Sequence, residues 1–225
     1  MIRTLLLLLL ASLLGVACTT LPEDQAVDIP IAERQAMLRA FSSWKALGRI
    51  SVSSTTQAIS GGIDWEQRDN RYRVALSSPL GQALFIEQGD DQATLQRQGK
   101  QPVLGRSAEA LVYEQLKVRV PLDQLTQWLR GLPGDQGKPA YDPYGRLRKL
   151  SYTDPDNIDW RADIRRYQAV DGMDLPALVV VQGGGYDIRL TVREWQSLAE
   201  EHPTPEPAAP AQEPGKRLSI PGLDS

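Results

Sequence analysis

The chain has one cysteine and one histidine among its 225 residues, although many kinds of active site depend on these residues. The histidine, His202, lies in a proline-rich segment near the C-terminus. The sequence therefore contains no Ser-His-Asp arrangement, no Cys-His pair and no histidine cluster for a transition metal. The cysteine, Cys18, has no second thiol with which to form an internal disulfide. The fold must rest on its hydrophobic core alone.

A basic surplus is also missing. The formal net charge is −3, with acidic and basic residues mixed along the chain, which argues against nucleic-acid binding. The glycine run 183–185 lacks the Lys-Ser/Thr pair of a phosphate-binding loop and is predicted to be a hairpin turn. Asp64 and Glu66 share a face of a predicted strand, as glycosidase carboxylates do, but a solvated strand face is the preferred interpretation. We predict no enzyme activity and no cofactor or metal.

The longest apolar run lies at the N-terminus. Arg3 precedes a run of leucines, and Gly15, Val16 and Ala17 are the small residues that a signal peptidase needs. The run is too short for a relaxed membrane span. Residues 1–17 are therefore predicted to be a signal peptide.

Cys18 directly follows this segment, a position that resembles the lipobox of bacterial lipoproteins. In a lipobox the thiol receives a diacylglycerol and the new α-amine receives a third acyl chain. Gly15 departs from the usual Leu of that motif. Thr19 comes next, whereas an aspartate there resembles the inner-membrane retention signal of enteric-type bacteria. The resemblance implies a lipid anchor on Cys18 and an outer-membrane location.

Composition divides the remainder into three parts. Residues 18–30 are polar and contain proline, which predicts a tether. Residues 31–198 are long enough for one domain with a substantial core. Residues 199–225 are rich in proline, alanine and glutamate, a composition typical of a disordered tail.

Apolar and polar side chains alternate from Trp44 onwards, which predicts half-buried antiparallel strands. Helical spacing predicts helices over 31–42, 108–116 and 122–130, and the residues 131–145 are predicted to be a loop. Strands are expected over 44–52, 59–66, 72–76, 82–88, 91–97, 100–104, 147–152, 158–167, 175–182 and 186–195. These elements predict a large, strongly curved antiparallel sheet with an open mouth that helices cover.

The concave face of such a sheet forms either a packed core or a ligand cavity. The tryptophans lie on or beside apolar stripes, and ordinary core is the simpler interpretation of each. Leu80 falls in the predicted turn 78–81, where polar residues are usual. It either folds back onto the sheet or stays in water, where it would contact a membrane or an apolar partner.

An ordered set of short motifs extends over about residues 40–196. The most specific are Pro79-Leu80-Gly81 and Trp128-Leu129-Arg130-Gly131-Leu132-Pro133-Gly134, and the others are Trp44 with Gly48-Arg49, residues 62–65, residues 72–74, and residues 186–190 with Trp195. Together with Cys18, this set resembles the LolB family of outer-membrane lipoprotein receptors.

The resemblance implies a mainly β fold with helices: an unclosed antiparallel β-barrel of about ten or eleven strands, capped by about three helices and enclosing a hydrophobic cavity. It also implies that the protein receives acylated lipoproteins from the periplasmic carrier LolA and inserts them into the inner leaflet of the outer membrane. Leu80 is then the membrane-inserting residue, and Cys18 holds the protein on the periplasmic face. Outer-membrane lipid is a further expected partner, and we expect a monomer.

We predict that the acyl-chain cavity is lined from several strands and one helix, by Trp44, Ile50, Ile63, Trp65, Val74, Leu125, Trp128, Trp160, Ile188 and Leu190. Two other non-enzymatic hypotheses stay open. The protein would be a lipid-anchored carrier of another lipid or glycolipid, or an envelope-assembly scaffold whose concave face is filled with side chains. A fluorescent acyl probe enters a cavity and ignores a filled core, so it separates these possibilities.

Overall fold

The computed structural model of the protein describes residues 29–78, 81 and 83–198. The predicted signal peptide, the proposed anchor Cys18, the proposed insertion residue Leu80 and the predicted tail lie outside these ranges. Within them, no helix has the length and apolar character needed to cross a membrane.

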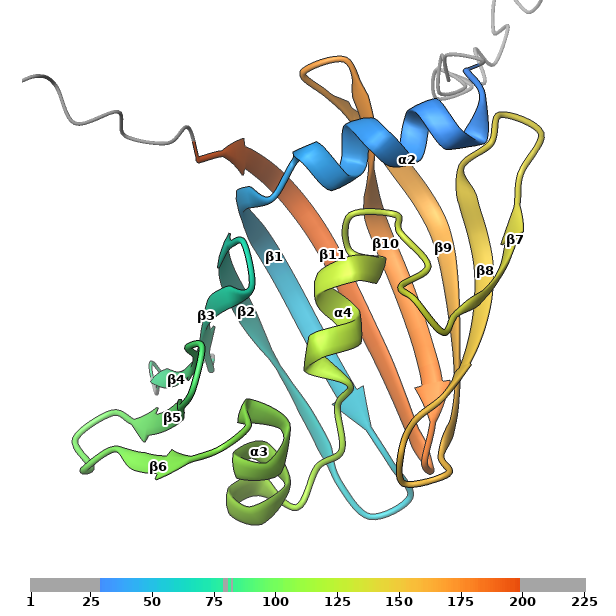
Figure 1. Cartoon of the computed structure of the whole chain (residues 1–225). Coiled ribbons are helices and arrows are strands. Elements are labelled where there is room, and N and C mark those ends of the chain that lie inside the picture. The colour runs from blue at the N-terminus through green and yellow to red at the C-terminus, as the bar shows by residue number, and fades with distance from the viewer. Residues whose placement is uncertain (1–28, 79–80, 82, 199–225) are drawn as a thin grey trace, which may run out of the picture.

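The described residues contain an 11-stranded antiparallel sheet that curves strongly without closing (Figure 1). Its strands are β1 (Ser43–Ser53), β2 (Ala58–Arg68), β3 (Arg71–Ser77), β4 (Ala83–Gln88), β5 (Ala93–Arg97), β6 (Val103–Gly105), β7 (Lys138–Tyr141), β8 (Leu147–Thr153), β9 (Asp159–Val170), β10 (Met173–Gly183) and β11 (Tyr186–Ser197). The order across the sheet is β6-β5-β4-β3-β2-β1-β11-β10-β9-β8-β7. The predicted fold class, an unclosed antiparallel sheet with helices, is confirmed.

Pairing of β1 with β11 joins two meanders into one sheet. We call strands β2–β6 the first arm and strands β7–β10 the second arm. The pairing includes a bulge between Leu47 and Gly48, and a Cβ atom at residue 48 would lie 2.0 Å from the Thr191 carbonyl oxygen. Only glycine permits so close an approach of the two backbones.

Strand β7 corrects the sequence prediction, because it lies inside 131–145, which was predicted to be a loop. The strand has 4 residues, most of them exposed, so its side chains show no alternation. It also contains Pro139, which sheets tolerate at an edge. The sequence carries no strand signal at this position, since β7 forms only by pairing with β8.

Helix α2 (Ile31–Ala40) crosses the end of the sheet where β1 begins and β11 ends (Figure 1). A buried ion pair holds it there: Nη1 of Arg34 lies 2.9 Å from the Asp174 carboxylate at the start of β10. Nη2 of Arg34 donates to the Tyr144 carbonyl at 3.1 Å. We call this end of the sheet the α2 end and the opposite end the mouth end.

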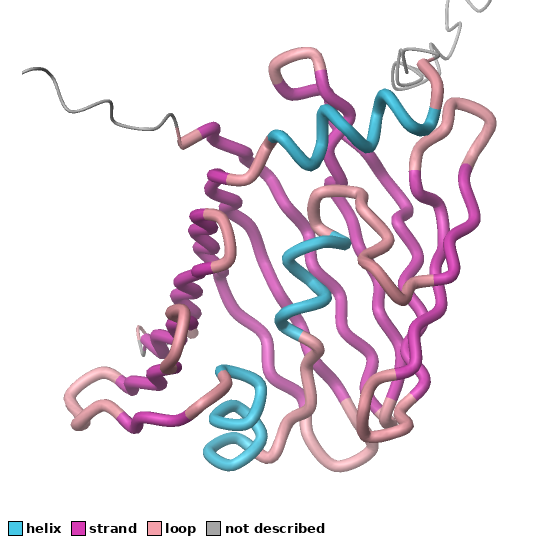
Figure 2. The backbone as a smooth tube through the Cα atoms, in the orientation of Figure 1, coloured by secondary structure: helices cyan, strands magenta, loops and turns pink. Residues whose placement is uncertain are grey.

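Helices α3 (Ala108–Leu116) and α4 (Leu122–Trp128) lie on the concave side (Figure 2). The hydroxyl of Ser107 accepts a hydrogen bond from the Ala110 N–H at 3.1 Å and so caps the N-terminus of α3. Helix α4 connects the two arms. The hydroxyl of Tyr72 on β3 donates to Asp123 at 2.9 Å, and the ring of Trp128 packs edge-on against Tyr152 of β8.

Candidate functional site

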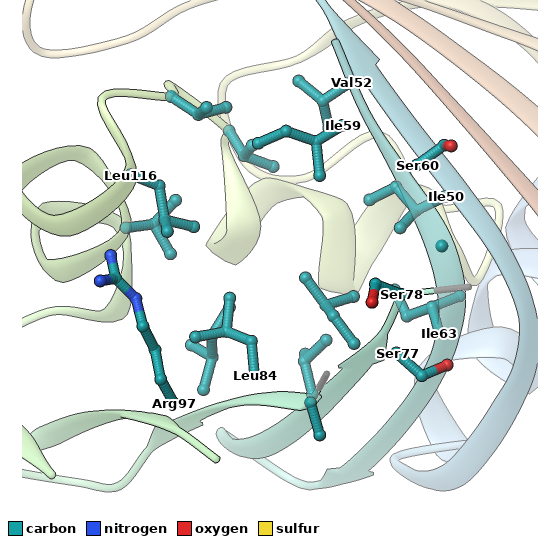
Figure 3. Close-up of a pocket in the computed structure, with 18 of the residues that line it drawn as sticks. Ile50, Val52, Ile59, Ser60, Ile63, Ser77, Ser78, Leu84, Arg97 and Leu116 are labelled. Atoms are coloured by element: carbon teal, nitrogen blue, oxygen red, sulfur yellow. The ribbon is translucent and has the colours of Figure 1, made fainter. Parts of the chain in front are cut away.

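An apolar cavity of about 540 Å³ lies between the first arm and α3. Figure 3 shows side chains from several elements pointing into it. Its wall consists of Ile50, Val52, Ile59, Ser60, Gly61, Ile63, Trp65, Val74, Leu76, Ser77, Ser78, Ala83, Leu84, Ile86, Arg97, Gln98, Lys100, Val112, Leu116, Val118, Val120 and Leu122.

Strand periodicity explains most of this wall. Side chains two residues apart along a strand share a face, so Ile50 with Val52, and Val74 with Leu76, all face the cavity. Helix α3 contributes Val112 and Leu116 from one face. The remaining side comes from the segment 117–121 between α3 and α4. The result is a pocket of aliphatic side chains that suits hydrocarbon.

Part of the predicted cavity set lies in this wall and part does not. Ile50, Ile63, Trp65 and Val74 line the cavity. The other predicted residues are almost completely buried but lie in the packed core outside the wall: Trp44, Leu125, Trp128, Trp160, Ile188 and Leu190. Two of these side chains are covered by other core rings, because Trp44 packs against Trp195 of β11 and Trp128 packs against Tyr152 of β8. The acyl-chain role of the predicted residues stays a prediction.

The sequence analysis did not predict several of the residues that line the cavity. Leu84 and Ile86 on β4 follow the same alternation as the predicted residues, so the signal was present in the sequence. Val118 and Val120 also alternate, but they lie in a segment without a strand partner. Their position depends on how the chain returns from α3 to α4, which periodicity does not determine.

Polar side chains gather where the cavity reaches the mouth end. Ser60, Ser77, Arg97, Gln98 and Lys100 all line it there. The guanidinium of Arg97 donates to the Gln115 carbonyl near the end of α3 at 2.7 Å. This bond connects β5 to the helix that covers the cavity.

The C-terminal end of α3, at Lys117, is hydrogen-bonded to side chains at the mouth end of the sheet. Lys117 has a left-handed φ of 57°, which ends the helix. Its carbonyl accepts hydrogen bonds from the side chains of Gln57 and Tyr186, each at 3.0 Å. Both partners lie near the mouth-end turns of β1–β2 and β10–β11, so the end of α3 is fixed from two directions.

The turn that contains Leu80 joins β3 to β4 at this same end. Of its residues, the structure describes Ser78 and Gly81. The Gly81 N–H donates to the Ser78 carbonyl at 3.0 Å, and Gly81 has a φ of 78°. Glycine is favoured at that φ. Ser78 also lines the cavity, so the turn begins at the mouth.

A polar contact joins α3 to α4 behind the cavity. The Asp123 N–H donates to a carboxylate oxygen of Glu109 at 3.0 Å. Burial, together with the negative charges of Asp123 and Asp154, raises the pKa of Glu109 to about 7. Burial also raises the pKa of Tyr72, whose hydroxyl bonds Asp123.

Because of Glu109, we expect the stability of the fold to fall as the pH rises. Between about pH 4.5 and 7 the unfolded chain loses the Glu109 proton while the folded protein keeps it, so the free energy of unfolding decreases over that range. Glu109→Gln retains an oxygen for the Asp123 N–H without the charge. Urea unfolding should show that this variant gains about 1–2 kcal/mol at pH 8, after allowance for partial exposure, and nothing at pH 4. An equal gain at both pH values would contradict the assignment.

The chemistry of the site is that of a binding pocket. Its wall carries no carboxylate, imidazole or thiol. Among the described residues, no group of three or more His, Cys, Asp and Glu side chains is arranged to hold a metal ion. The cavity and its polar mouth suit a ligand with an apolar part and a polar end.

Residues 42–195 match the sequence profile of a family described as "Outer membrane lipoprotein LolB". The chain is 30% identical to the outer-membrane lipoprotein LolB of Yersinia enterocolitica over 197 residues, which cover 84% of this chain and 94% of the relative. It is 33% identical to the LolB of Alkalilimnicola ehrlichii, with the same coverage. Among solved structures, a LolA superfamily protein from Nitrosomonas europaea is similar in fold, with a TM-score of 0.50, 12% identity, and coverage of 75% of this chain and 92% of that protein.

Proposed function

The chain belongs to the LolB family of outer-membrane lipoproteins, and we propose that it receives lipoproteins from the periplasmic carrier LolA and inserts them into the inner leaflet of the outer membrane. The observation that supports this role is the apolar cavity of about 540 Å³ beside α3. Cavities of about 300–1,000 Å³ enclose most of a ligand's surface. Here the ligand is the acyl part of a lipoprotein.

The physical demand on such a receptor is to keep hydrocarbon out of water. Each buried methylene contributes about 0.8 kcal/mol, so exposing three acyl chains would cost on the order of tens of kcal/mol. Free diffusion of the cargo is therefore excluded. Handover between two apolar cavities avoids this cost, and the transfer then requires only that carrier, receptor and membrane bind the chains in ascending order of affinity. No ATP is needed.

Two positions outside the described residues complete the proposal. The lipid on Cys18 anchors the protein to the periplasmic face of the outer membrane. Leu80, in the turn that begins at the cavity mouth, enters the membrane during delivery. The cavity lies in the domain and involves neither residue, so acceptance, anchoring and delivery are separable.

Removal of the anchor tests this separation. We expect Cys18→Ala, exported behind a cleavable signal peptide, to be soluble and to accept a radiolabelled lipoprotein from purified LolA as well as the anchored protein does. The measurement is the fraction of label that moves from LolA to the receptor after the two are separated. Acceptance by the anchored protein alone would show that the anchor belongs to the binding site. Acceptance by neither protein would contradict the proposed function.

A further inference from the structure

Three cations surround the mouth of the cavity. Arg97 ends β5, Lys100 lies in the following turn, and Lys117 ends α3. All three side chains are exposed. Within the described part of the chain none of them forms an ion pair, although cations elsewhere on the sheet do so, such as Arg73 with Glu87.

Carboxylates are scarce around these cations. Residues 50–63 and 74–86, which provide most of the cavity wall, contain no charged residue. Residues 92–108, which include β5 and β6, contain arginine and lysine but no acid. Helix α3 adds one exposed carboxylate, Glu114, near its end. Acidic residues lie on the other side of Lys117: Asp187 follows Tyr186, and Asp156 pairs with Arg119. The first-arm side of the mouth is therefore positive in a protein whose net charge is −3.

Exposed apolar groups lie around the same opening. Ile59 lines the cavity and is 42% exposed, and Tyr113 on α3 is also 42% exposed. The guanidinium of Arg119 stacks on the Tyr113 ring at 4.4 Å from its centroid. Figure 3 places Ile59 and Arg97 on different sides of the cavity. A surface that alternates exposed apolar groups, a tyrosine and cations is typical of proteins that bind at the membrane interface.

We propose that this cationic rim, formed by Arg97, Lys100 and Lys117, docks on the anionic phospholipid headgroups of a membrane and so turns the cavity mouth towards the bilayer. The proposal rests on the proposed function and adds a headgroup-binding surface to it. A phospholipid carries its negative phosphate directly above its hydrocarbon. The rim matches this arrangement, because its cations can contact the phosphates while its apolar opening faces the hydrocarbon. An acidic protein surface would match the charge but not the hydrocarbon.

The test measures binding to vesicles without any cargo. The full-length chain with Cys18→Ala is used, so that the anchor contributes nothing, and vesicles contain phosphatidylglycerol and phosphatidylethanolamine. Lys100→Gln with Lys117→Gln removes two cations, whereas Arg97 is retained because it bonds the Gln115 carbonyl. At low salt we expect vesicle affinity to fall about 25-fold, about fivefold for each cation. At 1 M salt the difference should nearly vanish, because screening is then strong.

A matched pair of substitutions controls for net charge. Arg71 and Arg166 are exposed, lie towards the α2 end and form no ion pair within the described residues. Arg71→Gln with Arg166→Gln should leave vesicle affinity within about twofold, since the removed charges lie far from the rim. An equal loss in both pairs would overturn the proposal, because net charge alone would then explain the binding.

Two further outcomes would also overturn it. The first is vesicle binding unchanged by the rim substitutions with LolA binding also unchanged. The second is unchanged vesicle binding together with weakened binding to purified LolA, which would assign the rim to an acidic protein partner. Neither outcome affects the proposed function, which is measured separately as acceptance of labelled lipoprotein.

Discussion

Replacing Leu76 and Leu84 together with tryptophan should exclude an acyl chain from the cavity. The two residues lie directly opposite each other on β3 and β4, and both side chains line the cavity. Two indole rings there would take the place of about four methylenes of a bound chain. The loss is about 3 kcal/mol, or about 100-fold in affinity for a fluorescent fatty acyl probe. Aromatic side chains suit strands, so we expect the variant to fold.

The opposite face of the same strands provides the control. Ala75 and Phe85 are also directly opposite each other, and their side chains point away from the cavity face because adjacent residues alternate. Ala75→Trp with Phe85→Trp adds aromatic bulk to the same two strands and should leave probe affinity unchanged. Equal losses in the two variants would mean that the probe does not bind in this cavity.

Leu80→Asp should separate acceptance of cargo from its delivery. The substitution leaves the cavity wall unchanged, so we expect the variant to accept lipoprotein from LolA at near-normal levels. Delivery should be lost, because penetration of the headgroup and acyl boundary depends on buried apolar area, and a charged side chain resists it. Labelled cargo should therefore accumulate on the receptor instead of entering liposomes. A turn residue held in water contributes little to stability, so the free energy of unfolding should change by about 0.5 kcal/mol or less.

Substitution of Leu104 provides a control for Leu80→Asp. Its side chain is 61% exposed on the edge strand β6, and it does not line the cavity. Leu104→Asp makes the same chemical change on the surface of the first arm and should leave delivery intact. Normal delivery by Leu80→Asp would contradict a membrane role for Leu80. An unfolded Leu80→Asp variant would instead show that the leucine packs against the sheet.

Strand periodicity was sufficient to predict the architecture. The alternation that begins at Trp44 corresponds to β1, and the long strands β9 to β11 follow equally regular patterns. Strand β7 was missed because its exposed residues carry no such pattern. Its existence depends on the neighbouring strand, and a local pattern does not contain that information.

The cavity was harder to predict, since alternation identifies the concave face but not what covers each part of it. Trp65 and Trp128 illustrate the difference. Both are almost fully buried and both follow apolar stripes, yet Trp65 lines the cavity, whereas Trp128 packs against Tyr152 in the core. The outcome depends on where α4 lies across the sheet. That position is set by contacts between residues far apart in sequence, such as Tyr72 with Asp123.

The position of Ile29 limits how far the body can move from its proposed anchor. Ile29 lies next to Gly145 and Gly172, at the α2 end, whereas the cavity opens at the mouth end. Strand β1 alone extends over about 35 Å between those ends. The chain from Cys18 to Ile29 spans at most about 40 Å when fully extended.

This length sets which orientations the body can take if Cys18 carries a lipid in the membrane. The mouth reaches that membrane only if the mouth end faces it and the extended tether runs along nearly the whole length of the sheet. In the upright orientation, the same tether holds the mouth up to about 75 Å from that membrane, facing an incoming carrier. Under the proposed function, acceptance and delivery would then require opposite orientations of the body, and the length of the tether is just sufficient for both.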